Sequence, residues 1–351
     1  MAKDFVLKLK QILKITIPLA LGIIILYFLY KGTNFNELWL YIKEANWLIL
    51  TSSLIFGLLG NVIRGLRWEL LINPLGYYPK RSNLIYAVLG NYAVNFALPR
   101  AGEIWRCGVI NKKEKIPFKK LIGTVIIDRM FDMIMVIIIA LIAFVCNVSD
   151  FFQNITKFNQ NIDEINQNIE KTDWQKFLTS PYPYLAILVL LILFILSVIF
   201  LKNNFLVKKI RSFLISMWND LLMVWKMKKK TLFIIYSFGI WTSYFLYFYI
   251  TFYAFDFTSH LGIAAGLFIF TLGSISMGIP SNGGLGPWQV AIVLGLYIYM
   301  VSPEQALAFA TGVFTFQSIW MVACGLFGIF ALSFNKSQKN ADDADNADLR
   351  R

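Results

Sequence analysis

The sequence predicts an all-α, polytopic integral membrane protein of about six to eight spans, in which two oppositely oriented broken hairpins form an inverted repeat. Three observations lead to this prediction. Hydrophobic residues make up 58% of the 351 residues and charged residues only 15%. Several apolar runs have the length of about twenty residues that a helix needs to cross a bilayer. Two further apolar segments are interrupted in the middle by Pro and Gly.

Residues 15–30 form the first expected span. Four lysines precede it, and it contains Pro18 and aromatic residues near its end but no small-residue cleavage site. We therefore expect a retained span and not a removed signal peptide. The transmembrane domain is expected to cover residues 1–333, and residues 334–351 are expected to be a polar, disordered cytoplasmic tail.

The first expected repeat covers residues 47–145. It consists of a span at 47–63, a hairpin at 83–111 that is broken at 98–103, and a span at 121–145. Lys and Arg lie on both flanks of the hairpin. Because basic flanks face the cytoplasm, the hairpin should enter and leave the membrane by the same face, as a re-entrant segment.

The second expected repeat covers residues 232–333. A span at 232–253 is followed by a hairpin at 261–300, broken at 278–286, and by a span at 304–334. The segment from 202 to 230 contains eight basic residues and one acid, Asp220. This places both ends of the chain in the cytoplasm, with a span at 185–201, and directs the second hairpin inward from the outer face. The alternative is that 261–279 and 288–300 are two full spans joined by a loop.

Both breaks carry groups that suit a charged head group. Arg100 places a cation at membrane depth, and Glu103 complements the positive end of the returning half-helix. Glycines near the start of the second half-helix leave backbone amides uncovered, and such amides bind anions of phosphate size. The alternative is a tight helix crossing that merely needs small residues. The candidate substrate-binding residues in the breaks are Arg100, Gly102, Glu103, Pro280, Gly283, Gly284 and Gly286.

A second candidate constellation is Asp128, Arg129 and Asp132, about two turns into the span at 121–145. The two acids are four residues apart and share one helix face. Charges at this depth face a wet interior or each other, so Arg64 and Arg67 at the end of the preceding span are their expected partners. The constellation either contacts substrate or forms an ion-pair network that clamps helices together.

Other kinds of site are not expected. The three cysteines have unrelated spacings, and His260 is the only histidine. We therefore expect no metal, no cofactor and no catalysis built on several histidines. The net charge of +13 gathers at the ends of the spans, so nucleic acid is not an expected partner.

Four motifs in the sequence resemble those of a known family. They occur in the order Arg64-Gly65-Leu66-Arg67-Trp68, Pro99-x-x-Gly102-Glu103-x-x-Arg106, Asp128-Arg129-x-x-Asp132 and Pro280-x-x-Gly283-Gly284-x-Gly286. Together they resemble the lysylphosphatidylglycerol synthase transmembrane region, also called the flippase-like family, from about residue 15 to residue 334. This adds Arg64, Arg67, Arg106 and Gln289 as supporting residues. In the family an acid commonly stands at the place of Gln289, and a second Pro at the place of Asn282.

The resemblance implies a multi-pass protein of the bacterial inner membrane that moves a lipid between leaflets. The expected partners are anionic or aminoacylated phospholipids or a lipid-linked intermediate, and a homodimer is an open alternative to a monomer. The aminoacyltransferase domain of the best-understood relatives is absent, so we expect a translocase and not an enzyme. Two alternatives remain: a membrane-embedded transferase acting on a lipid-linked sugar or phosphate, and a scaffold for envelope assembly.

Overall fold

The computed structural model describes residues 20, 22–98, 100–165, 224, 227–279, 281 and 283–334. These residues form helices and turns without a strand, which confirms the all-α class. The chain divides into two compact units, Met1–Val148 with Met227–Arg351, and Ser149–Lys226. The first, here called the main unit, is described below. The predicted span at 185–201 and residues 335–351 of the predicted tail lie outside the described residues.

Asparagine caps set the start of the first labelled helices. Residues 22–30 are helical, and α2 (Phe35–Glu44) and α3 (Trp47–Ile72) follow. The Asn34 side chain accepts a hydrogen bond from the Asn36 N–H, and the Asn46 side chain accepts from the next helix in the same way. Each bond satisfies an amide that has no partner inside its helix, which fixes where the helix begins.

Four helical segments are long and apolar enough to cross a membrane, judged by length and composition over the described residues. They are Trp47–Leu75, Phe118–Asn147, Lys230–Ala254 and Pro303–Phe334. They coincide with the predicted spans that begin at 47, 121, 232 and 304. The multi-pass character is confirmed, and a total of six to eight spans stays a prediction.

The first of these spans is longer than predicted. The sequence places its end at residue 63, because Arg64 and Arg67 read as charges on a cytoplasmic flank. The structure continues α3 to Ile72 and the short 3₁₀ turn η1 (Asn73–Leu75), and it buries both arginines. Buried carboxylate partners allow the helix to carry these charges in its interior, which hydropathy alone does not show.

The outer face of α6 (Phe118–Ile165) is apolar and exposed over its membrane-length part. Its exposed side chains recur at helical spacing: Ile126, Met133, Ile137, Leu141 and Val145. Water would not favour such a continuous apolar stripe, whereas lipid would. The stripe therefore marks a lipid-facing surface.

Each predicted hairpin is a pair of short helices. α4 (Arg81–Ala97) packs against α5 (Gly102–Glu114), and α12 (Ile263–Ser276) packs against α13 (Pro287–Ile298). At about 1.5 Å per residue these helices measure about 18 to 26 Å, less than the roughly 30 Å of a hydrocarbon core. The breaks lie where the sequence places them, although Pro99, Pro280 and Asn282 are outside the described residues.

The long helices pack closely where glycines lie against a neighbouring helix. α3 lies beside α10 (Lys230–Tyr249), where a Cβ on Gly60 would lie 2.7 Å from the Tyr244 ring. α14 (Pro303–Phe334) lies along α4, where a Cβ on Gly325 would lie 2.6 Å from the Cβ of Ala93. These contacts allow the backbones to approach closely, as small residues do in membrane bundles.

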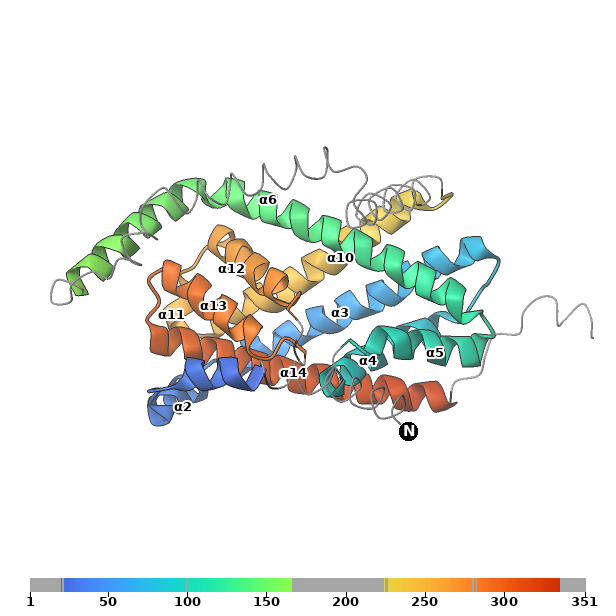
Figure 1. The fold of residues 1–351 in the computed structure, drawn as a ribbon, viewed down its shortest axis with the longest axis horizontal. Helices are drawn as coiled ribbons and strands as arrows, with labels where there is room; N and C mark the ends of the chain where they lie inside the picture. The colour runs from blue at the N-terminus through green and yellow to red at the C-terminus, as the bar shows by residue number, and fades with distance from the viewer. Residues whose placement is uncertain are drawn as a thin grey trace, which may run out of the picture. The chain divides into compact units, whose positions relative to one another are not determined.

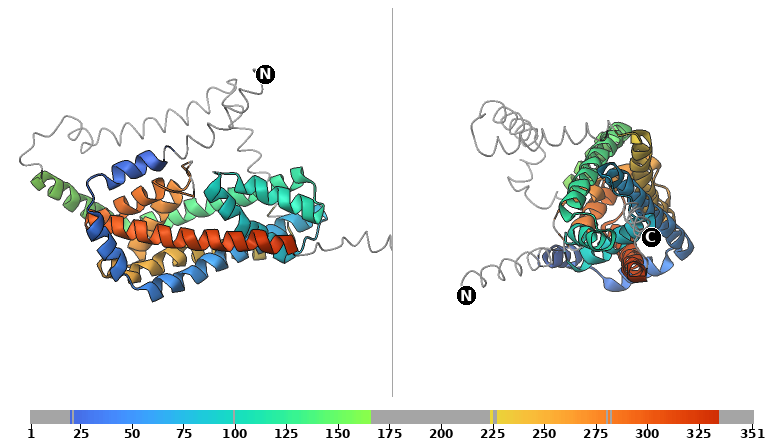
Figure 2. Two further views of the ribbon diagram at one scale, coloured as in Figure 1. Left: turned by 90° about the horizontal axis from the view of Figure 1, so that it is seen from below. Right: turned by 90° about the vertical axis from the view of Figure 1, so that its right-hand side faces the viewer.

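Separate apolar cores surround the two hairpins. The first is built around Trp68, Leu84, Cys107 and Leu121 and involves α3 to α6. The second joins the second hairpin to α10, α14 and the connection formed by η3 (Ile250–Ala254) and α11 (Asp256–Ser259). Within the main unit the two hairpins extend toward each other from opposite ends, so that their breaks face each other (Figures 1 and 2).

Candidate functional site

The two helix breaks meet inside the main unit. The Arg100 guanidinium donates a hydrogen bond from Nη2 to the carbonyl of Gly278, at 2.8 Å. Phe96, at the end of α4, lies so close to the second break that a Cβ on Gly283 would be 2.7 Å from its ring. Segments more than 170 residues apart in sequence thus form one region, as expected for a shared site.

The first break is shaped by a backbone that only particular residues allow. Arg100 is exposed and adopts a left-handed conformation with φ of 61°. The Gly102 N–H donates to the Asn95 side-chain oxygen at 2.7 Å. A Cβ on Gly102 would lie 2.3 Å from the carbonyl oxygen of Asn91, so no larger residue fits there. This glycine lets α5 begin directly against α4.

The second break contains three glycines in the left-handed region, with φ of 62° at Gly283, 90° at Gly284 and 90° at Gly286. Residues that carry a side chain rarely adopt this backbone conformation. A Cβ on Gly284 would also lie 2.2 Å from the Met277 sulfur. The glycines are therefore required by backbone geometry, independently of any ligand.

One sequence-based expectation, that the Gly286 amide is open to an anion, is wrong. The amide of Gly286 is not left uncovered for an anion, because it donates to the Gln289 side-chain oxygen at 2.7 Å. Gln289 is 3% exposed, and its side chain closes the first turn of α13 in the manner of a capping box. Its role in the structure is to cap this helix.

Asp128 and Asp132 of α6 are paired with Arg64 and Arg67 of α3, as expected from the sequence. Arg67 Nη2 lies 2.6 Å from Asp128 Oδ1 and 2.7 Å from Asp132 Oδ1. Arg64 Nη1 lies 2.5 Å from Asp132 Oδ2. All four side chains are buried or nearly so. Charge-assisted bonds of this kind offset the cost of removing the ions from water.

Arg106 of α5 joins the same cluster with fewer bonds. Its Nη2 lies 3.4 Å from Asp128 Oδ2, and its guanidinium carbon stacks 4.7 Å from the centre of the Trp68 ring. The side chain is fully buried, yet its Nε and Nη1 have no hydrogen-bond partner among the described residues. Arg106 is therefore the least satisfied cation of the cluster.

Glu103 and Arg129 connect the cluster to the first break. Arg129 Nη2 lies 3.1 Å from Glu103 Oε1, and Arg129 Nη1 lies 3.3 Å from Asp132 Oδ2. Their side chains are 27% and 38% exposed, which makes them the accessible edge of an otherwise buried group. We call the seven residues Arg64, Arg67, Arg106, Arg129, Glu103, Asp128 and Asp132 the ion cluster.

Several polar neighbours of the site were not predicted. Tyr244 of α10 accepts from Arg64 Nε at 3.2 Å, donates to Asn61 at 2.8 Å and lies 2.9 Å from the Tyr92 hydroxyl. In α4, Asn91 and Asn95 face the start of α5. Two asparagines four residues apart in an apolar helix share one face, and this spacing is the signal that could have identified them.

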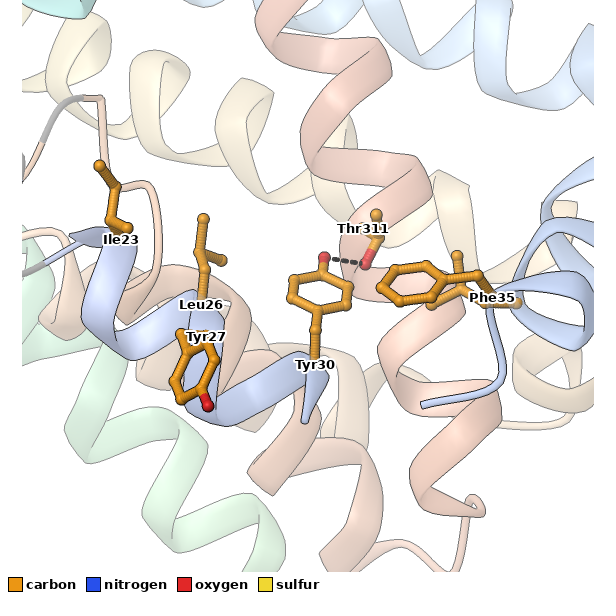
Figure 3. A pocket seen from close by; sticks show the side chains of 7 residues that line it. Ile23, Leu26, Tyr27, Tyr30, Phe35 and Thr311 are labelled. Atoms are coloured by element: carbon orange, nitrogen blue, oxygen red, sulfur yellow. Dashed lines mark hydrogen bonds between the residues drawn. The ribbon is translucent and has the colours of Figure 1, made fainter. Parts of the chain in front are cut away.

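An apolar groove lies apart from these charged groups (Figure 3). It has a volume of about 520 Å³ and is lined by Ile23, Leu26, Tyr27, Tyr30, Phe35, Leu38 and Thr311. Its one internal polar contact joins the Tyr30 and Thr311 hydroxyls at 2.6 Å. No predicted site residue lines the groove, whose surface suits hydrocarbon and not a charged group.

The described residues offer no metal centre: no three His, Cys, Asp or Glu side chains among them are placed to hold an ion.

Comparison with known proteins gives one finding. The family model described as the lysylphosphatidylglycerol synthase TM region matches residues 15–325. Neither curated proteins nor solved structures yield a match.

Proposed function

The chain belongs to the lysylphosphatidylglycerol synthase TM region family, and from this premise we propose that it is a membrane lipid translocase. It moves the polar head group of a phospholipid or of a lipid-linked intermediate between leaflets, while the acyl chains stay in the bilayer. The transported lipid is anionic or aminoacylated, and the protein works in the bacterial inner membrane with both ends in the cytoplasm.

The meeting of the two breaks supports this proposal most directly. Non-helical backbone at membrane depth is tolerated only where it is buried in protein or lines a polar cavity. Here two such breaks, approaching from opposite ends of the main unit, contact each other through Arg100 and Gly278. Paired broken helices with opposite directions are how many secondary transporters build a central site. We therefore take the hairpins to be re-entrant and related as an inverted repeat.

The ion cluster supplies the polar surface for a head group. It adjoins the first break, since Glu103 is the second residue of α5, directly after Gly102. Ionisable residues within membrane proteins face substrate pathways or one another. In this proposal the head group contacts Arg100, Glu103 and Arg129, which are at least partly exposed, while the buried arginines and aspartates hold α3, α5 and α6 together.

Movement requires the contact between the breaks to open. The hydrogen bond from Arg100 to Gly278 is formed by an exposed side chain, so its loss costs little free energy. Rocking of one hairpin against the other would expose the region first to one side and then to the other. Arg100 would then alternate between the Gly278 carbonyl and the head group.

The intramembrane acids favour a translocase over a transferase. A transferase acting on a lipid-linked phosphate needs a carboxylate that is available to the reacting atoms. Asp128, Asp132 and Glu103 each accept from at least one arginine. This arrangement suits a fixed charge pattern better than proton transfer.

A proteoliposome assay tests the proposal. Head-group-labelled phosphatidylglycerol and lysylphosphatidylglycerol are placed in one leaflet, and their appearance in the other leaflet is followed with and without the full-length protein. We expect faster redistribution with protein, and a rate about tenfold lower for Arg100→Ala, because a charged hydrogen bond to the head group is lost. Arg81→Ala is the matched control, since Arg81 lies outside the site and pairs with Glu69. Equal rates with and without wild-type protein would refute the proposal.

A further inference from the structure

The helix of residues 22–30 packs directly on the backbone of the second break. Gly22 is buried, and a Cβ on it would lie 3.1 Å from the Leu285 carbonyl oxygen. In the other direction, a Cβ on Gly286 would lie 3.1 Å from the Gly22 carbonyl oxygen and 3.3 Å from the Cβ of Ile25. The two backbones therefore touch, a contact that glycines permit and larger residues prevent.

The second break thus lies between two neighbours. Gly283 lies against Phe96 of the first hairpin, whereas Gly286 lies against the helix of residues 22–30. The side chains of Ile24 and Phe28 on this helix are 53% and 66% exposed, as expected on a surface that faces lipid. Because non-helical backbone at membrane depth must be covered by protein, the helix of residues 22–30 forms a wall between the second break and the bilayer.

This wall is held weakly. Apart from Gly22, the side chains of residues 22–30 are half-buried or exposed. The apolar groove of about 520 Å³ lies between this helix, α2 and α14, and Figure 3 shows the Tyr30 side chain reaching across to α14, where its hydroxyl bonds to that of Thr311 at 2.6 Å. Lipid chains are as apolar as the other groups in this contact, so exchanging the contact for lipid costs little free energy.

The chain that follows the helix provides a hinge. Gly32 has a φ of 84°, and nothing lies within 4 Å of a Cβ placed on it. The next helix, α2, is fixed in place, because Asn34 caps its start and Leu38 and Ile42 are buried in a core shared with α14. A weakly held helix is thus joined to an anchored helix through a glycine in open space. Residues at the ends of elements absorb the backbone rotations of hinge motions in this way.

We propose that residues 22–30 form a lateral gate, which turns about Gly32 and opens the second break to the bilayer. The inference concerns access to the site of the proposed function and rests on that proposal. In the closed state, Gly22 covers the break and the bond from Tyr30 to Thr311 holds the gate to α14. In the open state both contacts are broken, and a head group enters from the side while its chains remain among the other lipids.

Distances between two spin labels test the gate in proteoliposomes of the full-length protein. With the native cysteines replaced by serine, the labels are attached at Ile24→Cys on the gate and Ile319→Cys on α14, two exposed positions. We expect two distance populations. Tyr30→Phe removes an interhelical hydrogen bond and should raise the ratio of open to closed protein about fivefold. Tyr27→Phe, at an exposed tyrosine that lines the same groove, is the control and should leave the ratio unchanged.

A bulkier residue at the covered break gives a second, independent variant. Gly22→Val pushes a side chain against the Leu285 carbonyl, a backbone group, and should shift the labels toward the open distance. Gly123→Val, in α6 with nothing within 4 Å of the added Cβ, is the matched control. One unchanged distance in the wild type, in Tyr30→Phe and in Gly22→Val would overturn the inference.

Cross-linking separates the gate from the proposed function. A bifunctional thiol reagent about as long as the Tyr30 side chain links Tyr30→Cys to Thr311→Cys and holds the gate closed. We expect complete cross-linking to slow translocation at least tenfold, with the two single-cysteine proteins as controls. Undiminished translocation would refute the gate and leave the translocase standing. Two distance populations without any translocation by the wild type would refute the translocase and leave the hinge motion of the helix standing.

Discussion

At the scale of single residues, Gly102 is the position where the backbone leaves least room. A Cβ there would meet the Asn91 carbonyl at 2.3 Å, a backbone atom that cannot move aside. We expect Gly102→Ala to lower the free energy of unfolding by about 1–3 kcal/mol. Thermal unfolding in detergent measures this. Gly108→Ala, in the same helix with nothing within 4 Å of the added Cβ, should be neutral or slightly stabilising. Equal effects of the two changes would contradict the steric argument.

Asp128 is the acid on which the ion cluster depends most. It is fully buried, and Arg64, Arg67 and Arg106 all lie within 4 Å of its carboxylate, at 3.6, 2.6 and 3.4 Å. Asp128→Asn leaves three buried cations short of one negative charge, so we expect a loss of about 3–5 kcal/mol in stability. The control is Glu69→Gln, whose partner Arg81 is exposed, with an expected loss of about 0–1 kcal/mol. Similar losses for both variants, measured by thermal or denaturant unfolding, would show that the cluster is not a buried network.

The sequence predicted that Arg64 and Arg67 pair with the acids of α6, but not that Glu103 and Arg106 join the same cluster or how unequally its members are satisfied. The spacing of Asp128 and Asp132 predicts a shared helix face, and the nearby arginines follow as partners from charge alone. The unpaired edge of Arg106 depends on the stacking of Trp68 and on the distance between α5 and α6, which are tertiary quantities. A sequence motif names the residues of a site but not the distances between their side chains.

At the scale of the helices, Gln289 shows how one side chain fixes the start of a half-helix. Its side chain caps α13 by accepting from the Gly286 N–H. Gln289→Glu keeps an acceptor of the same length, and the helix start offsets part of the cost of burying its charge, so we expect a smaller loss of stability than when the acceptor is removed. Gln289→Leu removes the acceptor and should cost about 0.5–2 kcal/mol. A destabilisation by Glu as large as that by Leu would contradict the capping role.

The breaks themselves could be predicted from sequence because Pro and clustered glycines interrupt apolar runs that would otherwise be continuous. The end of α3 could not, because a charged residue in an apolar run reads as the edge of a span. The structure resolves this by placing Arg64 and Arg67 opposite carboxylates inside the main unit. Helix ends in membranes are therefore predicted well only where charges face water.

At the scale of the whole molecule, the contact between the hairpins is the point that the proposed transport cycle must break. We expect a bifunctional thiol reagent that links Arg100→Cys to Gly278→Cys, in a protein whose native cysteines are replaced by serine, to slow translocation at least tenfold. The Arg100 side chain reaches the Gly278 carbonyl, so a reagent about as long as this side chain can join the two cysteines. Single-cysteine proteins treated in the same way are the controls, and undiminished translocation after complete cross-linking would show that the breaks need not separate.

α14 connects the two hairpins through one continuous helix. Near one end it is wedged against α4 at Gly325, and nearer the other its Phe314 ring contacts Trp288 of α13, at 5.6 Å between ring centres. α14 is an uninterrupted helix of 32 residues, and a rigid helix moves as one body, so that a displacement at one end also displaces the other. In the proposed transport cycle, a shift of the first hairpin would therefore reach the second even when the breaks have parted, and the two halves would move together. This mechanical linkage would keep a passage from standing open to both sides of the membrane at once.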